Sequence, residues 1–186
     1  MYDLYSPLQK WLALSLLLFL CMPCMAQRGV FLTQQDFLKQ AFTQVPSSKT
    51  YWFTPEDRTT AEAIAGHSLP LRIRYFQSGE RTAWILEEIG KELPITLGIV
   101  IEQQKIQLLR VMEYREVRGG EVRYDFFVQQ FNNATLTQPN HKLNKDIDGI
   151  SGATLSVRAL TKSARLALFI SRQANAAELQ SAKLGH

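Results

Sequence analysis

The chain has 186 residues, of which 46% are hydrophobic and 20% are charged. This composition supplies enough apolar material for a buried core and excludes an intrinsically disordered protein, and the length suits one domain plus a targeting segment. The net charge of +4 is spread along the chain, without Lys and Arg clusters interleaved with aromatic residues, so we expect no nucleic-acid partner.

The first recognisable element is a short apolar run from Trp11 to Met22. The run is shorter than the roughly 20 residues that span a bilayer, but it is typical of the core of a signal peptide. Pro23 ends the run, and Cys24-Met25-Ala26 offers small residues for cleavage. We therefore predict a signal peptide at residues 1–26 and an exported protein at the periplasmic or extracytoplasmic face of the membrane. An uncleaved anchor is the alternative, because the segment before the run is only weakly basic.

Both cysteines, Cys21 and Cys24, belong to this leader. Their spacing is that of a redox or metal pair, but no strand precedes them and no helix start follows them. A chain cleaved after Ala26 therefore has no disulfide and no thiolate chemistry.

Two helices are predicted in the part of the chain that follows. Thr33-Gln34-Gln35-Asp36 resembles a capping box and predicts a helix to about Phe42. Residues 45–49 are interpreted as a loop. Thr54-Pro55-Glu56-Asp57 repeats the start signal with Pro at the first helical position, and Gly66 is a C-terminal stop.

A run of strands comes next. Alternating or β-branched patterns predict strands at residues 71–75, 82–89, 94–102 and 106–114. The short polar segment 102–105 predicts a hairpin between the last two strands. Aromatic and aliphatic residues three or four apart between Tyr124 and Phe131 then suggest a short helix.

The chain closes with an amphipathic helix from Leu155 to about Gln173. We predict a single α+β domain, with an antiparallel or mixed sheet, flanking helices and this C-terminal helix. The predicted organisation is a helical and strand extension at 27–81, the main domain at 82–173 and a flexible tail at 174–186, either frayed or a loose helix.

Small residues and hydroxyls crowd together between Asp148 and Ser156, directly before the closing helix. Gly149 and Gly152 permit a tight turn, and the unpaired N–H groups of a helix start suit a phosphate. By itself such a segment is more often only a helix cap.

The string Asp148-x-x-Ser151-Gly152-Ala153-Thr154 resembles the flavinylation motif of the FMN-binding domain family. This family includes the C subunit of sodium-translocating NADH:quinone reductase and the G subunit of Rnf-type complexes. The resemblance implies that Thr154 carries FMN through a phosphoester bond, attached by a dedicated flavin transferase. It also implies that the neighbouring motif residues contribute to the cofactor site, namely Asp148, Ser151, Gly152, Ala153, Leu155 and Ser156.

A second stretch, Glu116-Val117-Arg118-Gly119, looks similar to the Glu-Thr-x-Gly-like loop that lies near the isoalloxazine ring in this family. It departs from the pattern by having Val117 where the family often has Thr or Ser. The resemblance makes Glu116, Gly119 and Gly120 candidate cofactor residues, whereas two adjacent glycines alone are as readily an ordinary turn.

Other chemistries find little support in the sequence. The histidines His67, His141 and His186 lack the spacing of metal ligands. A hydrolase nucleophile at Ser151 or Thr154 would need a nearby base, and no histidine lies between His141 and His186. A dinucleotide-binding fingerprint is absent, so we do not expect direct oxidation of NAD(P)H. No catalytic residue is predicted.

We therefore expect an exported electron-transfer flavoprotein, more an electron carrier or redox-complex subunit than a stand-alone oxidoreductase. Its FMN on Thr154 would relay electrons between membrane or haem-type partners and an extracytoplasmic acceptor. Two alternatives remain: a structural or sensing FMN-binding subunit of a membrane redox complex, and a small flavin reductase.

Overall fold

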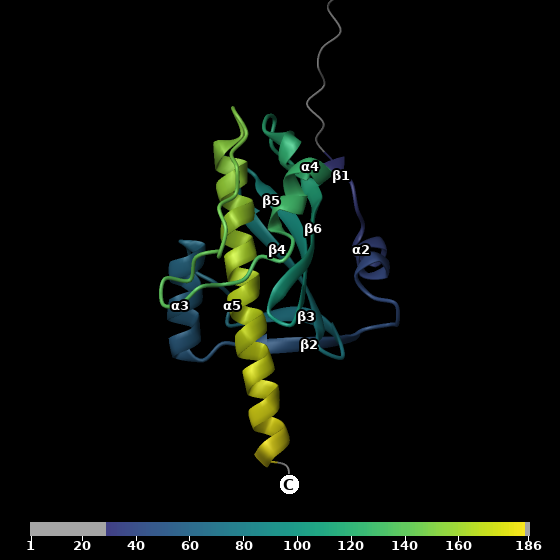
Figure 1. Cartoon of the computed structure of the whole chain (residues 1–186), viewed down its shortest axis with the longest axis vertical. Coiled ribbons are helices and arrows are strands. Elements are labelled where there is room, and N and C mark those ends of the chain that lie inside the picture. Colours follow the sequence, from purple (N-terminus) through teal and green to yellow (C-terminus); the bar gives the residue numbers. More distant parts are fainter. Residues whose placement is uncertain (1–28, 185–186) are drawn as a thin grey trace, which may run out of the picture.

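The computed structural model describes residues 29–184, so the predicted signal peptide lies outside the described residues (Figure 1). A six-stranded antiparallel sheet has the order β1-β6-β5-β4-β3-β2. The strands are β1 (Gly29–Val30), β2 (Ser47–Trp52), β3 (Arg72–Ser78), β4 (Arg81–Ile89), β5 (Pro94–Glu102) and β6 (Lys105–Tyr114). The helices are α2 (Gln34–Ala41), α3 (Pro55–Ala65), α4 (Asp125–Val128) and α5 (Thr154–Leu184), with 3₁₀ turns η1 (Gly120–Arg123) and η2 (Gln129–Phe131). The predicted single α+β domain is confirmed, and its sheet is antiparallel.

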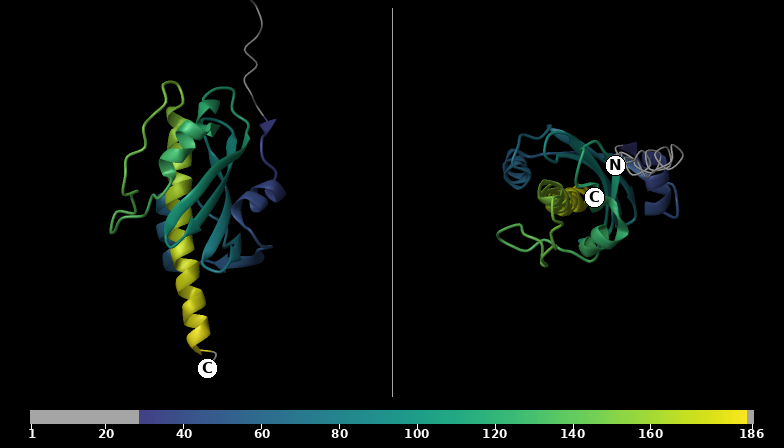
Figure 2. Two further views of the ribbon diagram at one scale, coloured as in Figure 1. Left: turned by 45° about the vertical axis from the view of Figure 1, so that its right-hand side comes forward. Right: turned by 90° about the horizontal axis from the view of Figure 1, so that it is seen from above.

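The sheet curves around α5, which lies along its concave face, while α2 lies on the convex face (Figure 2). The larger hydrophobic cluster fills the concave side and includes the fully buried Trp84, Ile99, Leu109 and Leu160. A smaller cluster lies between the convex face and α2. Burying apolar side chains on both faces explains why β5 is a nearly continuous hydrophobic run and why β4 contains four consecutive hydrophobic residues, Ala83–Leu86.

Contact between Phe37 and Gly98 joins the N-terminal part of the chain to the sheet. The Phe37 ring is fully buried, and a Cβ at Gly98 would lie 2.6 Å from its Cε2 and Cζ atoms. Only glycine leaves room for this ring on strand β5. Residues 29–42 are therefore packed into the domain, and β2 and β3 belong to the same sheet as the later strands.

The local start and stop signals of the two early helices are confirmed. Thr33 Oγ1 accepts a hydrogen bond from the N–H of Asp36 at 3.2 Å, and Thr54 Oγ1 accepts one from the N–H of Asp57 at 3.1 Å. Gly66 ends α3 with φ of 77°, in the left-handed region that favours glycine.

Two local predictions are wrong. Residues 45–49 were expected to form a loop, but β2 begins at Ser47, because these polar residues pair in register with β3. Helix α5 was expected to end near Gln173, but it continues to Leu184, so residues 174–184 of the expected tail are helical.

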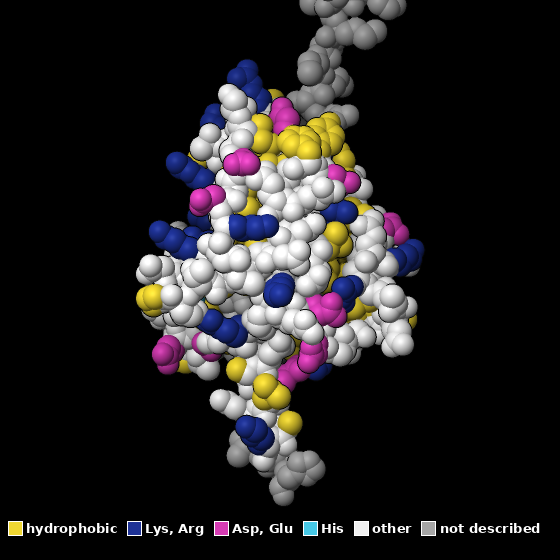
Figure 3. All heavy atoms as spheres, in the orientation of Figure 1, with side chains coloured by type: hydrophobic (Ala, Val, Ile, Leu, Met, Phe, Trp, Pro, Cys, Tyr) yellow, Lys and Arg dark blue, Asp and Glu magenta, His cyan; other side chains and the backbone are white. Residues whose placement is uncertain are grey.

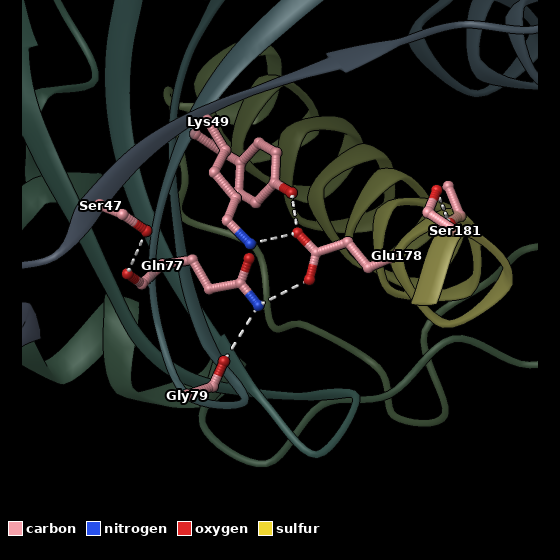
Figure 4. A network of polar contacts seen from close by, with 8 residues as sticks. Ser47, Lys49, Gln77, Gly79, Glu178 and Ser181 are labelled. Carbon is pink, nitrogen blue, oxygen red and sulfur yellow. Dashed lines mark hydrogen bonds and ion pairs between the residues drawn. The ribbon is translucent and has the colours of Figure 1, made fainter. Parts of the chain in front are cut away.

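The extension of α5 has a tertiary cause. The Glu178 carboxylate accepts hydrogen bonds from Lys49 Nζ at 2.6 Å, from the Tyr75 hydroxyl at 2.8 Å and from Gln77 Nε2 at 3.1 Å (Figure 4). These donors come from β2 and β3, so the sheet holds the helix at Glu178, beyond the predicted end near Gln173.

Candidate functional site

A tight turn leads from the polar loop into α5. The N–H of Ala153 donates to the carbonyl of Ile150 at 3.0 Å, and Gly152 has φ of 81° in open surroundings. Helix α5 begins at Thr154, and the N–H of Val157 donates to the carbonyl of Ala153 at 2.9 Å. The N–H groups of the first helical turn precede this ladder and have no partner within the helix.

The motif residues divide into two groups by their exposure. Ser151, Gly152, Thr154 and Leu155 are exposed, whereas Ala153 and Ser156 are 3% and 4% exposed. Thr154 thus presents its hydroxyl to solvent at the first residue of the helix. The Ser156 hydroxyl faces the protein, so among the three hydroxyls only those of Ser151 and Thr154 are accessible to another molecule.

Ser156 is bonded to the loop after β6. The Tyr114 hydroxyl donates to the carbonyl of Arg118 at 2.5 Å, and its oxygen lies 2.9 Å from Ser156 Oγ. Because Tyr114 donates its hydroxyl proton to the carbonyl of Arg118, the Tyr114 oxygen accepts the hydrogen bond from the Ser156 hydroxyl. Burial raises the pKa of Tyr114, with the charges of Glu116 and Glu121 acting in the same direction and the Ser156 hydrogen bond opposing them, so this hydroxyl keeps its proton at neutral pH.

Gly119 lies directly against the start of α5. Its φ is 84°, and a Cβ at this position would lie 3.0 Å from Ser156 Oγ and from the Tyr114 hydroxyl oxygen, and 3.2 Å from Ala153 Cβ. The two stretches singled out in the sequence therefore meet in space. Gly120 differs from Gly119, since a Cβ there would make ordinary contact with Tyr114 at 3.6 Å.

The Glu116 side chain is directed into the β4–β5 loop. Its Oε1 atom accepts from the N–H groups of Lys91, Glu92 and Leu93 at 2.5, 2.6 and 2.9 Å, and the residue is 6% exposed. Burial alone would raise the pKa of this carboxyl, but the three backbone donors and the charge of Lys91 hold it below its ordinary value. Glu116 therefore stays ionised at neutral pH and organises the loop.

The loop before the motif is tied to η2. The N–H of Asp148 donates to Gln130 Oε1 at 2.8 Å, while the Asp148 side chain is exposed. Lys145 Nζ donates to the carbonyls of Gln130 at 3.0 Å and Asn132 at 2.9 Å. Tyr114 and Gln130 were not among the predicted site residues, and only the position of Tyr114, directly before the glycine loop, offered a signal.

Exposed hydrophobic side chains gather at the end of the molecule where α5 begins. The end of β4, the start of β5 and the end of β6 lie together there, because Ile89 pairs with Pro94 and Ile95 with Tyr114. Figure 3 shows apolar side chains at this end, beside α4 and β1. This apolar end comprises Val30, Phe31, Ile89, Leu93, Val117, Tyr124, Phe126 and Leu155.

The described histidines have structural contacts. The His67 ring bonds Glu88 at 3.2 Å, and the His141 ring packs edge-on against Phe169 at 5.4 Å. Within residues 29–184 no cluster of three His, Cys, Asp or Glu side chains could hold a metal ion. In the same range, none of the helices combines the length and the apolar character needed to cross a membrane.

A family model described as an FMN-binding domain matches residues 90–168. The match extends from the end of β4 into α5, so it contains both the loop at Glu116–Gly120 and the motif at Asp148–Ser156. A search of curated proteins gives no match to this chain.

Proposed function

Residues 90–168 belong to the FMN-binding domain family, which makes the chain a flavin-binding protein, and from this premise we propose that it is an exported electron-transfer flavoprotein. In this proposal FMN is attached through its phosphate to Thr154 by a flavin transferase. The protein relays electrons between membrane or haem-type partners and an extracytoplasmic acceptor.

The surroundings of Thr154 suit a phosphoester. The hydroxyl is exposed at the first residue of a long helix, where unpaired N–H groups and the positive end of the helix dipole stabilise a phosphate. Ser156, two residues further, is buried and bonded to Tyr114, and thus is not a competing acceptor. The exposed hydroxyl at the helix start, next to the docked Gly119 loop, is the observation that carries the proposal.

The residues around the motif favour a carrier over an enzyme that processes a substrate. FMN accepts an electron pair from a hydride donor and passes electrons on singly, so the protein has to supply a tether and a suitable environment. An enzyme acting on a substrate positions an acid or a base beside the ring. Glu116, a buried carboxylate of this region, is already committed to three backbone N–H groups and stays ionised.

The apolar end supports contact with partners. Brief electron-transfer encounters need an accessible surface close to the cofactor, and apolar patches on soluble domains mark such contacts. Leu155 and Val117, which are 41% and 53% exposed, flank the Thr154 turn and the Gly119 loop. Strand β1, at which the described part of the chain starts, lies at the same end.

The proposal is tested by the intact mass of the exported protein, produced with and without the flavin transferase. We expect a mass increase of one FMN, less the water lost in forming the ester, only with the transferase. Thr154→Ala should abolish the increase, and Thr154→Ser should retain part of it because the hydroxyl remains. A full increase in Thr154→Ala would move the attachment to another hydroxyl, with Ser151 as the accessible candidate, and no increase in the wild type would refute covalent attachment. Normal electron flux through Thr154→Ala would favour the structural-subunit alternative.

A further inference from the structure

The sheet has an open edge at β2, the edge opposite β1. One side of this strand pairs with β3 along its whole length, from Ser47 to Trp52. In the described part of the chain, no backbone hydrogen bond joins the other side of β2 to another segment. Free N–H and C=O groups along a strand form a template for a further strand, and β2 contains no proline to prevent this.

A groove with a volume of about 580 Å³ follows this edge. One wall is the consecutive run Lys49–Trp52, and the other is the C-terminal part of α5, where Ala174, Ala177 and Ser181 face the groove. Small side chains on the helix leave space between it and the strand. The groove thus exists because α5 extends past the predicted end of the helix.

Hydrogen bonds fix the base of the groove, and the two charged side chains there form an ion pair with each other. Glu178 bonds Lys49, Tyr75 and Gln77, so it holds the helix at a set distance from β2 (Figure 4). Its pairing with Lys49 also neutralises the charge of that lysine. The charge that a bound segment would meet therefore comes from the outer face of the sheet.

On that outer face two arginines lie beside an exposed tryptophan. Trp52 is 60% exposed, and the Arg72 guanidinium lies 5.1 Å from the centre of its ring. Arg74 is exposed on the same face, opposite Thr50 in the register of β2 and β3. Neither arginine makes an ion pair with another residue in the range 29–184. Tryptophan and arginine are the residue types that most often dominate binding energy at protein interfaces.

We propose that this groove binds an extended segment of an acidic partner protein, which adds to the sheet as a strand beside β2. Side chains of a strand alternate between its two faces. One set would face Ala174 and Ala177 and has to be small or aliphatic. The other set would lie about 10 Å from the β3 backbone, twice the spacing of neighbouring strands, within reach of the long side chains of Arg72 and Arg74. Carboxylates in this second set would form ion pairs with Arg72 and Arg74.

Charge also selects against a second copy of the chain as the occupant. Pairing of two β2 edges would place β2 of one copy within reach of the arginines on β3 of the other, but β2 contains Lys49 and no acidic residue. A second copy would therefore leave the arginines without a carboxylate partner.

The test uses the exported protein and a short fluorescent peptide in which glutamate and valine alternate, with a lysine–valine peptide as the control. We expect the acidic peptide to raise fluorescence anisotropy on binding and the basic peptide not to bind. The double variant Arg72→Glu with Arg74→Glu should weaken binding about tenfold. A matched variant, Lys105→Glu with Arg158→Glu, changes exposed residues elsewhere by the same net charge and should bind like the wild type.

Amide exchange of residues 47–52 provides the structural readout, since an added strand protects the outward N–H groups of β2. Ala177→Trp, an exposed position on α5, should fill the groove and remove both binding and protection without unfolding the protein. The proposal is overturned if the acidic peptide does not bind, if both charge-changed variants lose binding equally, or if β2 gains no protection. Dimerisation through β2, detected by light scattering, would also overturn it by making a second copy the occupant.

Discussion

The hydroxyl of Ser156 donates a hydrogen bond to the hydroxyl of Tyr114 across a distance of 2.9 Å, and this contact joins the first turn of α5 to the end of β6. Tyr114 in turn donates to the carbonyl of Arg118, so a chain of hydrogen bonds leads from the helix into the glycine loop. The position of Thr154, two residues before Ser156, therefore depends on a residue of the sheet.

Replacing Ser156 with Ala should loosen this connection without removing the proposed acceptor. Loss of a buried hydrogen bond costs about 1 kcal/mol, and the Tyr114 oxygen would lose its donor while keeping its bond to Arg118. We expect a lower midpoint in urea and slower attachment of FMN by the transferase, with full attachment at long times. Ser151→Ala is the control, because its exposed side chain should leave stability unchanged. Unaltered attachment kinetics in Ser156→Ala would show that the hydrogen bond does not position Thr154.

The two glycines of the loop should respond differently to alanine. Gly119 has a positive φ and its Cβ would come within 3.0 to 3.2 Å of three atoms, so Gly119→Ala should destabilise the protein by about 1–3 kcal/mol. Gly120 lacks both constraints, and Gly120→Ala should stay within about 0.5 kcal/mol of the wild type. Urea unfolding of both variants measures the difference, and equal effects would contradict the packing described for Gly119.

The environment of Glu116 predicts a loss of stability in acid. Its pKa in the folded protein is below the ordinary value of 4.5. The stabilisation that the ionised carboxylate provides is therefore present above that ordinary value and is lost as the pH falls through the folded pKa. Glu116→Gln should have a lower free energy of unfolding than the wild type at neutral pH. This difference should become smaller as the solution is acidified. Unfolding by urea at a series of pH values tests this, and a gap that is constant with pH would exclude the proposed ionised state.

Phe37 and Gly98 should behave as a coupled pair. Phe37→Ala removes a fully buried ring and should cost about 3–5 kcal/mol. Gly98→Ala inserts a methyl group at 2.6 Å from that ring and should cost about 1–3 kcal/mol. In the double variant the methyl group occupies space left by the ring, so the sum of the single effects should exceed the combined effect. Simple additivity would mean that the two residues are not in contact.

Local signals in the sequence were sufficient for much of this fold. Thr33, Thr54 and Gly66 act through neighbours a few residues away, so helix starts and stops could be predicted from short patterns. Likewise the hydrophobic strands and the turn at residues 102–105 carry their own pattern, and the turn has positive φ at both Gln103 and Gln104.

Tertiary contacts decided the features that the sequence did not predict. Polar β2 is a strand only because β3 pairs with it, and α5 continues because Glu178 meets residues about a hundred positions earlier in the chain. The candidate site likewise has one feature that follows from a local motif and one that depends on a tertiary contact. The exposed Thr154 follows from the motif, while burial of Ser156 depends on Tyr114, 42 positions away.

The reaction of the flavinylated protein depends on the residues around its proposed flavin. The buried carboxylate Glu116 is committed to backbone donors, and the rings of His67 and His141 contact Glu88 and Phe169, so these three residues are already engaged within the protein. In our proposal, the exposed apolar residues around Thr154 instead serve as a surface for short-lived contact with a redox partner. We therefore expect rapid reduction and reoxidation by membrane or haem-type partners, and little turnover with NADH alone. Stopped-flow absorbance of the flavin measures both rates in the same preparation.

Replacing Val117 with Glu, a change at an exposed position, should slow the exchange with partners and leave the slow NADH reaction unaltered. Steady NADH oxidation at the rate of partner-dependent reduction would instead identify the protein as a flavin reductase.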